Sequence, residues 1–442
     1  MRLTRPLLCL ALLLMVSSQA AELPQAQQVQ SLQLDNGLKI LVWPDHDIPN
    51  VALYNWVRVG SRNEAPGITG LAHFFEHMMF NGTSTRAQGD FDRTLEAHGG
   101  SSNAFTMEDV TVYQDWIPHV ALPLTFELEA DRLHNLAFEP KVIESEREVV
   151  YSERRLRIED DPTGRLEEQV QATAFLAHPY GIPIIGWPSD IEHWQLDDLK
   201  RFFQTYYVAR NCTFVVVGDV DPAEVFALAR RTLASLPQAP PPPAVRTVEP
   251  EQRGERRVRL ETQAQNPLLQ VAYHGLAAKD PQAPALELLV RILADGSSSR
   301  LHRRLVEQDR LAISVDATVQ GGFDPALVWF YLTLPEAGDL AQVERVFDEE
   351  LERVLKDGIP AAELAKAKQL QLAGFWRGLA TIDGKAQALG QYEVLHGDYR
   401  KLFDAPRDYE SVTTQAVLDV ARKLLRKQSR TVGVLVPTQA GA

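Results

Sequence analysis

Apolar residues follow two different periods along the chain, and the period changes from segment to segment. Residues 51–60, "VALYNWVRVG", alternate as a strand does, whereas residues 71–80, "LAHFFEHMMF", form a largely apolar, helix-like segment. Further strands are predicted at residues 267–276 and from Thr213 and Thr431. Strands in groups with helical runs between them predict the α+β class rather than strict βαβ alternation. The predicted helices lie at residues 121–135, 141–157, 285–296, 341–356 and 361–375.

A proline-rich stretch divides this pattern into two similar halves. Four consecutive prolines in "LPQAPPPPAV", residues 236–245, predict an extended connector, because they cannot continue a helix or a central strand. Each half starts with a strand and a helix and ends with an apolar strand. We therefore expect two homologous α+β domains, each an antiparallel-rich sheet covered by helices. Their predicted limits are residues 22–236 and 250–442, with the linker at residues 237–249.

The first 21 residues predict a signal peptide. A basic start precedes the apolar run Leu7–Val16, and the small residues after it predict cleavage near Ala20 or Ala21. The run is too short to span a bilayer. Cys9 inside it lacks the small preceding residue of a lipoprotein signal. We therefore expect a periplasmic protein without a stable membrane anchor.

Composition and charge narrow the class of partner. Hydrophobic residues make up 45% of the chain and charged residues 24%, which is typical of a soluble globular protein. The formal net charge of −14 disfavours nucleic acid, so no nucleic-acid partner is expected. Beyond the predicted signal peptide Cys212 is the single cysteine, so no intramolecular disulfide is expected, and its place in an apolar strand favours a packing role.

The segment "HFFEH" carries three polar side chains within an otherwise apolar helix. His73 and His77 are four residues apart, which places both imidazoles on one face of a helix. This spacing suits two ligands of one zinc ion. Glu76 stands one residue before the second histidine, close enough to reach a water molecule on the metal. The alternative is a core helix whose histidines bond to nearby carbonyl groups.

A zinc site of this kind needs a third protein ligand. The predicted helix at residues 142–157 supplies Glu146 and Glu153, which are seven residues apart and share one helical face. A helix this rich in charge is also commonly a solvated, ion-paired surface. The residue types alone therefore leave both glutamates open as the third ligand.

Beyond the predicted signal peptide, nearly the whole chain resembles the pitrilysin-type zinc peptidases. The similarity is greatest to the branch that contains bacterial peptidases and mitochondrial processing peptidase. The matching segments are "GSRNE" (60–64), "GLAHFFEHMMFNGT" (70–83), "GGSSNAFTMEDVTVY" (99–113), "EREVVYSE" (146–153), "AHPYGIPIIG" (177–186) and "GSSSRL" (296–301).

The resemblance implies a zinc metalloendopeptidase with one zinc ion per chain. In the family the third ligand is a glutamate about 76 residues after the second histidine, which is Glu153 here. Glu146 then supports the site from outside the ligand set. His73 and His77 complete the ligands, and Glu76 takes a proton from the zinc-bound water and hands it to the leaving amine.

The resemblance also implies where a peptide or unfolded protein substrate binds. The strand around Asn103, Ala104 and Phe105 would pair with an extended substrate through main-chain hydrogen bonds, which supply affinity without requiring a sequence. The alternative is an ordinary sheet strand that binds no ligand.

The second half departs from the family's active enzymes. Glu287, Val290 and Arg291 stand where the first half has its zinc motif. Active single-chain relatives carry an arginine and, seven residues later, a tyrosine that stabilise the transition state. Val306 and Ile313 stand at those two positions, and neither side chain can donate a hydrogen bond.

Heterodimeric members of the family show a similar division of the site. The resemblance therefore implies a zinc-bearing subunit whose partner, of similar size and without the zinc motif, supplies the Arg/Tyr pair. Two alternatives remain: a self-sufficient homodimer, and a non-catalytic structural or assembly subunit of the same fold. A non-catalytic subunit has no need to keep His73, Glu76, His77 and Glu153 together.

Overall fold

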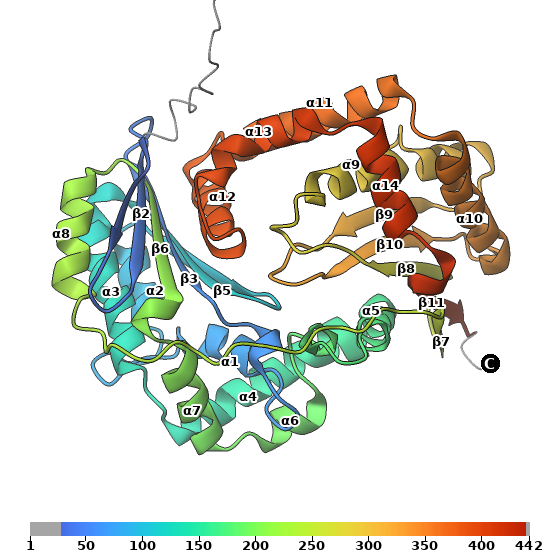
Figure 1. Ribbon diagram of the computed structural model, residues 1–442. Coiled ribbons are helices and arrows are strands. Elements are labelled where there is room, and N and C mark those ends of the chain that lie inside the picture. The colour runs from blue at the N-terminus through green and yellow to red at the C-terminus, as the bar shows by residue number, and fades with distance from the viewer. Residues whose placement is uncertain (1–27, 439–442) are drawn as a thin grey trace, which may run out of the picture.

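The computed structural model describes residues 28–438, so the predicted signal peptide lies outside the described residues. The chain forms two α+β units that lie next to each other (Figure 1). The first unit contains a six-stranded sheet with the strands β1 (Gln30–Gln33), β2 (Lys39–Pro44), β3 (Asn50–Val57), β4 (Ser101–Thr106), β5 (Thr111–Pro118) and β6 (Cys212–Gly218). Their order across the sheet is β1-β2-β6-β3-β5-β4, which leaves β4 at one edge.

The second sheet repeats the arrangement of the first without a counterpart of β1. Its order is β7-β11-β8-β10-β9. Each sheet has one parallel pair, β2 with β6 and β7 with β11, and its other pairs are antiparallel. The prediction of two homologous α+β domains is confirmed. The strands are β7 (Arg256–Thr262), β8 (Leu268–His274), β9 (Ser314–Val319), β10 (Leu327–Thr333) and β11 (Arg430–Pro437).

Helices occupy most of the chain between the strands of each sheet. In residues 28–438, none of them combines the length and the apolar content that a membrane crossing requires. The first half contains α1 (Leu71–Met78), α2 (Asp90–Ala97), α3 (Leu122–Asn135), α4 (Pro140–Arg154), α5 (Pro162–Ala174), α6 (Pro188–His193), α7 (Leu196–Tyr206) and α8 (Pro222–Thr232). The second half contains α9 (Ala283–Ala294), α10 (Leu340–Asp357), α11 (Ala361–Gly378), α12 (Ile382–Leu395), α13 (Lys401–Ser411) and α14 (Thr414–Leu424).

The apolar residues of α1 fix this helix against the first sheet. Phe74 and Phe75 are fully buried in one core with Val51 and Leu53 of β3. Burial of side chains of this size stabilises the folded chain by about 1.5–3 kcal/mol each. The position of α1 is therefore set by packing, and its histidines do not have to contribute to that core.

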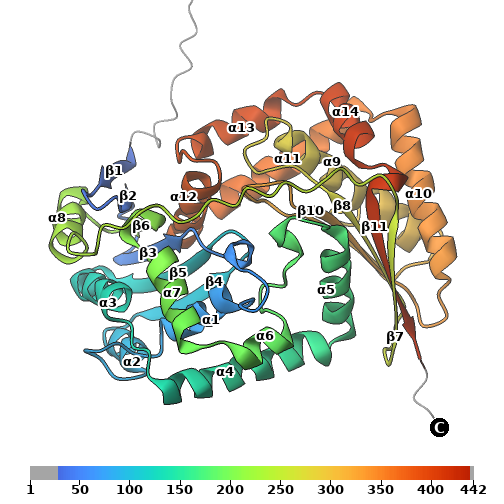
Figure 2. The ribbon, with the colours of Figure 1, turned by 60° about the horizontal axis from the view of Figure 1, so that its bottom comes forward.

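The other face of each sheet is covered by a helix from the other half of the chain. Helix α12 packs on β3 and β6, and α5 packs on β7, β8 and β11 (Figures 1 and 2). Both contacts need glycine. A Cβ on Gly390 of α12 would lie 2.0 Å from Nε1 of Trp56, and one on Gly433 of β11 would lie 2.3 Å from Cγ2 of Val170. The hydrophobic pattern did not predict this exchange.

A buried polar network also joins the two halves next to β4. Arg62, which is 7% exposed, donates hydrogen bonds to Asp109 at 2.8 Å and to Asp324 at 2.5 Å. The hydroxyl of Tyr180 donates to Asp109 at 2.7 Å. Because Asp109 lies in the turn between β4 and β5, the network fixes the end of β4 relative to the second half.

The proline-rich connector contains no helix or strand between the end of α8 at Thr232 and the start of β7 at Arg256. This agrees with an extended connector. The domain limits at residues 22–236, 237–249 and 250–442 stay a prediction, since the exchange of α5 and α12 gives each unit a helix from the other half of the sequence.

Candidate metal centre

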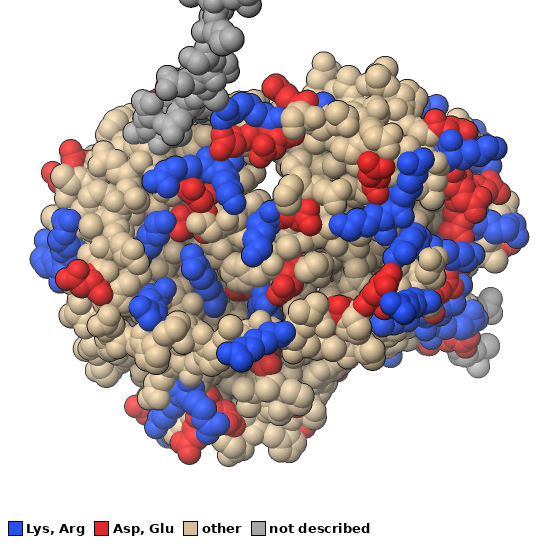
Figure 3. All heavy atoms as spheres, in the orientation of Figure 1, with Lys and Arg blue, Asp and Glu red and all other residues tan. Residues whose placement is uncertain are grey.

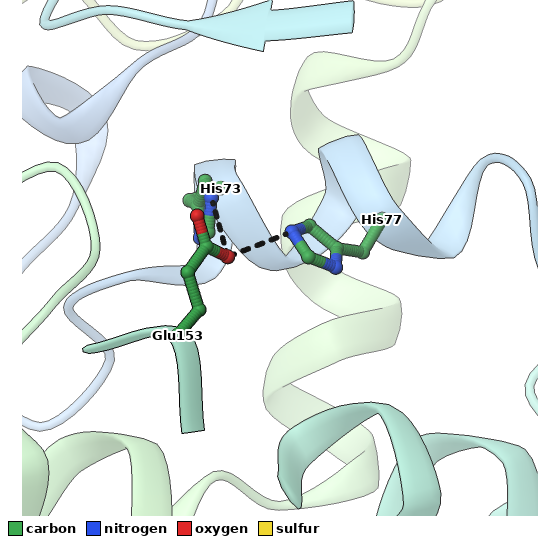
Figure 4. Close-up of side chains that lie close together, drawn as sticks. All are labelled: His73, His77 and Glu153. Carbon is green, nitrogen blue, oxygen red and sulfur yellow. Dashed lines mark ion pairs between the residues drawn. The ribbon is translucent and has the colours of Figure 1, made fainter. Parts of the chain in front are cut away.

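Helices α1 and α4 bring together three side chains of the types that bind metals (Figure 4). Oε2 of Glu153 lies 3.6 Å from Nε2 of His73 and 3.4 Å from Nε2 of His77. Across residues 28–438, these three form the one group of His, Cys, Asp and Glu side chains whose ligand atoms all lie within 4.8 Å of one another. Of the two glutamates that the sequence left open, Glu153 is the one that faces both histidines.

The separation of these atoms fits a zinc ion. Zinc binds nitrogen and oxygen ligands at about 2.0–2.2 Å, so two ligands of one tetrahedral ion lie roughly 3.3–3.6 Å apart. Two imidazole nitrogens and one carboxylate oxygen are a donor set that zinc prefers. Burial lowers the pKa of His73 to about 4, which keeps its imidazole neutral and able to bind a metal.

Glu146 holds the ring of His77 from the other side. Its Oε1 lies 2.7 Å from Nδ1 of His77. This contact favours a proton on Nδ1 and leaves Nε2 free to face a metal. Burial alone would lower the pKa of His77, but Glu146 and Glu153 raise it to about 9. Contact with His77 in turn holds the pKa of Glu153 below its usual value.

Glu76 lies on the same helix and is held by the edge strand. Its Oε2 accepts a hydrogen bond of 2.5 Å from the hydroxyl of Thr106, the last residue of β4. Burial raises the pKa of Glu76, and the bond from Thr106 partly opposes this. A carboxylate with a raised pKa is a better proton acceptor near neutral pH. The sequence did not single out Thr106, because its partner is 30 residues away in a helix.

Strand β4 carries the residues predicted to bind substrate. Among the described residues it pairs with β5 alone, so its outer edge is not used by the sheet. Asn103 is exposed, and Ala104 and Phe105 are half-buried. Because Thr106 of the same strand contacts Glu76, the edge runs beside the candidate metal centre.

The start of α1 is held by two of the segments noted in the sequence. In "GSRNE", the carboxylate of Glu64 accepts hydrogen bonds of 2.7 Å from the backbone N–H groups of Gly70 and Ala72. In "AHPYGIPIIG", the backbone at Ile185 lies so close that a Cβ on Gly70 would be 2.5 Å from its carbonyl oxygen. Sequence reasoning missed the role of Glu64, because no regular spacing links it to the helix.

As far as Thr438, the last described residue, the second half has no equivalent centre. Glu287 of α9 accepts hydrogen bonds from the hydroxyl of Tyr409 and, at 3.4 Å, from the amide of Gln371. Nε of Arg291 donates to Oε1 of Gln371 at 3.0 Å. Val290 is buried in the core. The polar residues at these positions bind one another and offer no pair of imidazoles.

The two positions expected to carry an Arg/Tyr pair differ in exposure. Val306 is half-buried on a π-helical segment, His302–Gln308, and packs on the second core. Ile313 is 55% exposed, and its backbone N–H donates to the carbonyl of Thr333 at 2.7 Å. Neither residue offers a side-chain donor to a substrate.

Charged residues are mixed on the face shown in Figure 3, where Lys and Arg alternate with Asp and Glu. The net charge of −14 is therefore not gathered into one acidic patch on this face.

Both halves of the chain match family models. Residues 40–187 match the insulinase family, peptidase family M16, and residues 193–371 match the inactive domain of the same peptidase family. The second match agrees with the absence of the zinc motif from α9.

Curated relatives match nearly the whole chain. The zinc protease PqqE of Helicobacter pylori is 31% identical over 423 residues, which cover 92% of this chain and 93% of that protein. An uncharacterised zinc protease of Mycobacterium tuberculosis is 31% identical over 402 residues, covering 89% of this chain and 90% of the relative.

Solved structures have the same fold. The crystal structure of a protease from Helicobacter pylori is 30% identical with a TM-score of 0.89, over 92% of this chain and 99% of that one. The periplasmic protease PqqL from Escherichia coli is 23% identical with a TM-score of 0.78, and the match spans 95% of this chain but 48% of PqqL. The resemblance noted in the sequence is confirmed, and the chain belongs to the insulinase family of peptidases, peptidase family M16.

Proposed function

We propose that the chain, a zinc protease of family M16, is an endopeptidase that hydrolyses peptides or unfolded polypeptide segments with one zinc ion per chain. The observation that carries this proposal is the convergence of His73, His77 and Glu153 at distances that fit zinc. Zinc bound there would activate a water molecule and polarise the scissile carbonyl group.

Three side chains around the proposed zinc site have separate roles in the reaction. Glu76 accepts the proton of the attacking water and passes it to the leaving amine, and its raised pKa suits both steps. Thr106 holds Glu76 in place. Glu146 orients His77 so that its Nε2 faces the metal.

An extended peptide is the substrate that the edge of β4 fits. Backbone groups of Asn103, Ala104 and Phe105 would pair with the substrate backbone, as a further strand of the sheet does. A folded protein keeps its strands paired with one another, so peptides and unfolded segments are favoured.

The replacement Glu76→Gln tests the assigned chemistry. The amide cannot accept the proton, while the zinc ligands are unchanged. We expect about one zinc per chain, as in the wild type, and a loss of turnover of about 10²-fold or more. Glu148→Gln, at an exposed position of α4, is the matched control and should keep both properties. Cleavage by Glu76→Gln at a near wild-type rate would show that this role is wrong.

The chain is further proposed to be the zinc-bearing subunit of a heterodimer. Support comes from Val306 and Ile313, which leave the site without side-chain donors for the oxyanion of the transition state. The partner would be a family member of similar size that lacks the zinc motif and carries the Arg/Tyr pair. The match to this chain covers about half of PqqL. A chain of this fold can therefore be joined covalently to a further segment of similar length.

Two alternatives to the heterodimer have less support. A self-sufficient homodimer needs another donor in place of the Arg/Tyr pair. A non-catalytic subunit has no use for Glu76 held by Thr106 beside three converging ligands.

A periplasmic location is also part of the proposal. It is supported by the apolar run Leu7–Val16 and by the periplasmic location stated for PqqL. N-terminal sequencing of the protein from a periplasmic extract should find a chain that starts near Ala21 or Glu22. An uncleaved chain in the cytoplasm would contradict this location.

A further inference from the structure

Glu64 is a buried carboxylate whose only described partners lie at the start of the metal-binding helix. It is 7% exposed, and each of its oxygens accepts one backbone hydrogen bond of 2.7 Å, from Gly70 and from Ala72. The first N–H groups of any helix have no partner within the helix. Residue Gly70, at the N-cap of α1, has no side chain to supply one. Glu64 takes this role from outside the helix.

The first turn of α1 needs such support because the helix is short. It has eight residues, and isolated helices below about 12 residues are marginal in water. Ala72, which Glu64 holds, is the neighbour of the proposed ligand His73. A first turn that frays would therefore move His73 before it moves His77, which lies in the last turn.

Other groups fix the loop that leads into α1, and none of them bonds to the helix amides that Glu64 holds. Asp190 accepts hydrogen bonds from the backbone and hydroxyl of Thr69, and Nε1 of Trp194 donates to the carbonyl of Thr69. These contacts end one residue before Gly70. Glu64 is thus the described side chain that links the loop to the first turn itself.

We propose that Glu64 is a positioning residue of the metal centre: by holding the first turn of α1, it fixes His73 and so sets the affinity for zinc. The proposal rests on the proposed zinc site of His73, His77 and Glu153. Groups that orient metal ligands from outside the ligand set commonly change metal affinity about 10–100-fold when removed.

A helix cap that serves only stability makes a different prediction. Its loss would lower the melting temperature and leave the zinc dissociation constant of the folded protein unchanged. Asp221 provides the matched control, since its carboxylate accepts a hydrogen bond of 2.7 Å from Ala223 at the start of α8. Helix α8 lies at the far side of the first unit from α1 (Figure 1).

The experiment compares Glu64→Gln and Glu64→Ala with Asp221→Asn and Asp221→Ala. The zinc dissociation constant is measured by competition with a chromophoric chelator, and the melting temperature on the zinc-free protein. We expect the dissociation constant to rise about tenfold or more in Glu64→Ala and by a smaller factor in Glu64→Gln, which keeps one acceptor oxygen. Both Asp221 variants should stay within about twofold of the wild type, whatever their melting temperature.

The outcomes separate this inference from the proposed function. Unchanged zinc affinity in both folded Glu64 variants overturns the inference and leaves the zinc site standing. If Glu64→Ala does not fold, Glu64→Gln, which has nearly the same volume, decides alone. A wild-type protein that binds no zinc overturns the proposed function and this inference with it.

Discussion

At the residue scale, two histidines on one helix face differ in charge. Burial lowers the pKa of His73 to about 4, whereas Glu146 and Glu153 raise that of His77 to about 9. Without metal, the ring of His77 is therefore protonated on both nitrogens at neutral pH, whereas that of His73 is neutral. A histidine that binds zinc must be neutral, so zinc has to displace the proton on Nε2 of His77.

This difference predicts proton release on zinc binding. At pH 7 we expect about one proton per zinc, and the apparent affinity should rise about tenfold per pH unit until the pH approaches the pKa of His77, where the dependence levels off. Calorimetric titrations in two buffers of different ionisation enthalpy measure the released protons. No release at pH 7 would show that His77 is already neutral, contrary to its contacts with the two glutamates.

At the element scale, the sequence predicts several of the elements, but neither α5 nor α12 nor the contacts between distant elements. The periods at residues 51–60 and 71–80 correspond to β3 and α1, since local periodicity follows from which side of an element is buried. The continuous apolar run of β6 predicts burial on both faces. It could not predict that one cover is α12, because that contact joins residues far apart in the sequence.

Prediction of the candidate site from the sequence has the same limit, because local spacing gives no information about contacts between distant residues. The helical spacing of His73 and His77, and of Glu146 and Glu153, predicts which side chains share a face. It does not choose between the two glutamates, and it gives no signal for residues that contact α1 from elsewhere. Glu64 and Thr106 are of that kind, since one lies in a loop and the other in an edge strand.

The exchange of helices predicts that Gly390 tolerates no side chain. In Gly390→Ala the new Cβ would lie 2.0 Å from Nε1 of Trp56, and we expect a loss of about 1–3 kcal/mol in the free energy of unfolding. Gly374→Ala in α11 is the control, because nothing lies within 4 Å of its Cβ and alanine favours a helix. Urea unfolding of both variants measures the difference. Equal stability of the two would contradict the close packing of α12 on β3.

At the scale of the whole molecule, the two halves are joined by the exchange of α5 and α12 and by the buried network of Arg62. These contacts bind the halves into one unit and fix the end of β4. They do not supply the donors absent at Val306 and Ile313. Under the proposed function, a partner subunit supplies these donors.

The heterodimer proposal predicts low activity of the chain by itself. The purified protein should bind zinc and cleave peptides slowly. Co-expression with a family member that has the Arg/Tyr pair but no zinc motif should raise kcat by about 10²-fold, the scale on which one oxyanion donor acts. The same partner with its arginine replaced is the control. Full activity of a homogeneous preparation of this chain alone would contradict the heterodimer proposal and favour the self-sufficient homodimer.

Zinc removal and replacement test the central claim most directly. The protein, with its partner if one is required, is assayed for peptide cleavage and for bound zinc before chelation, after chelation and after addition of one equivalent of zinc. We predict about one zinc per chain at His73, His77 and Glu153, loss of cleavage when the zinc is removed, and recovery when it returns. Cleavage that continues in the chelated, zinc-free protein would contradict this prediction.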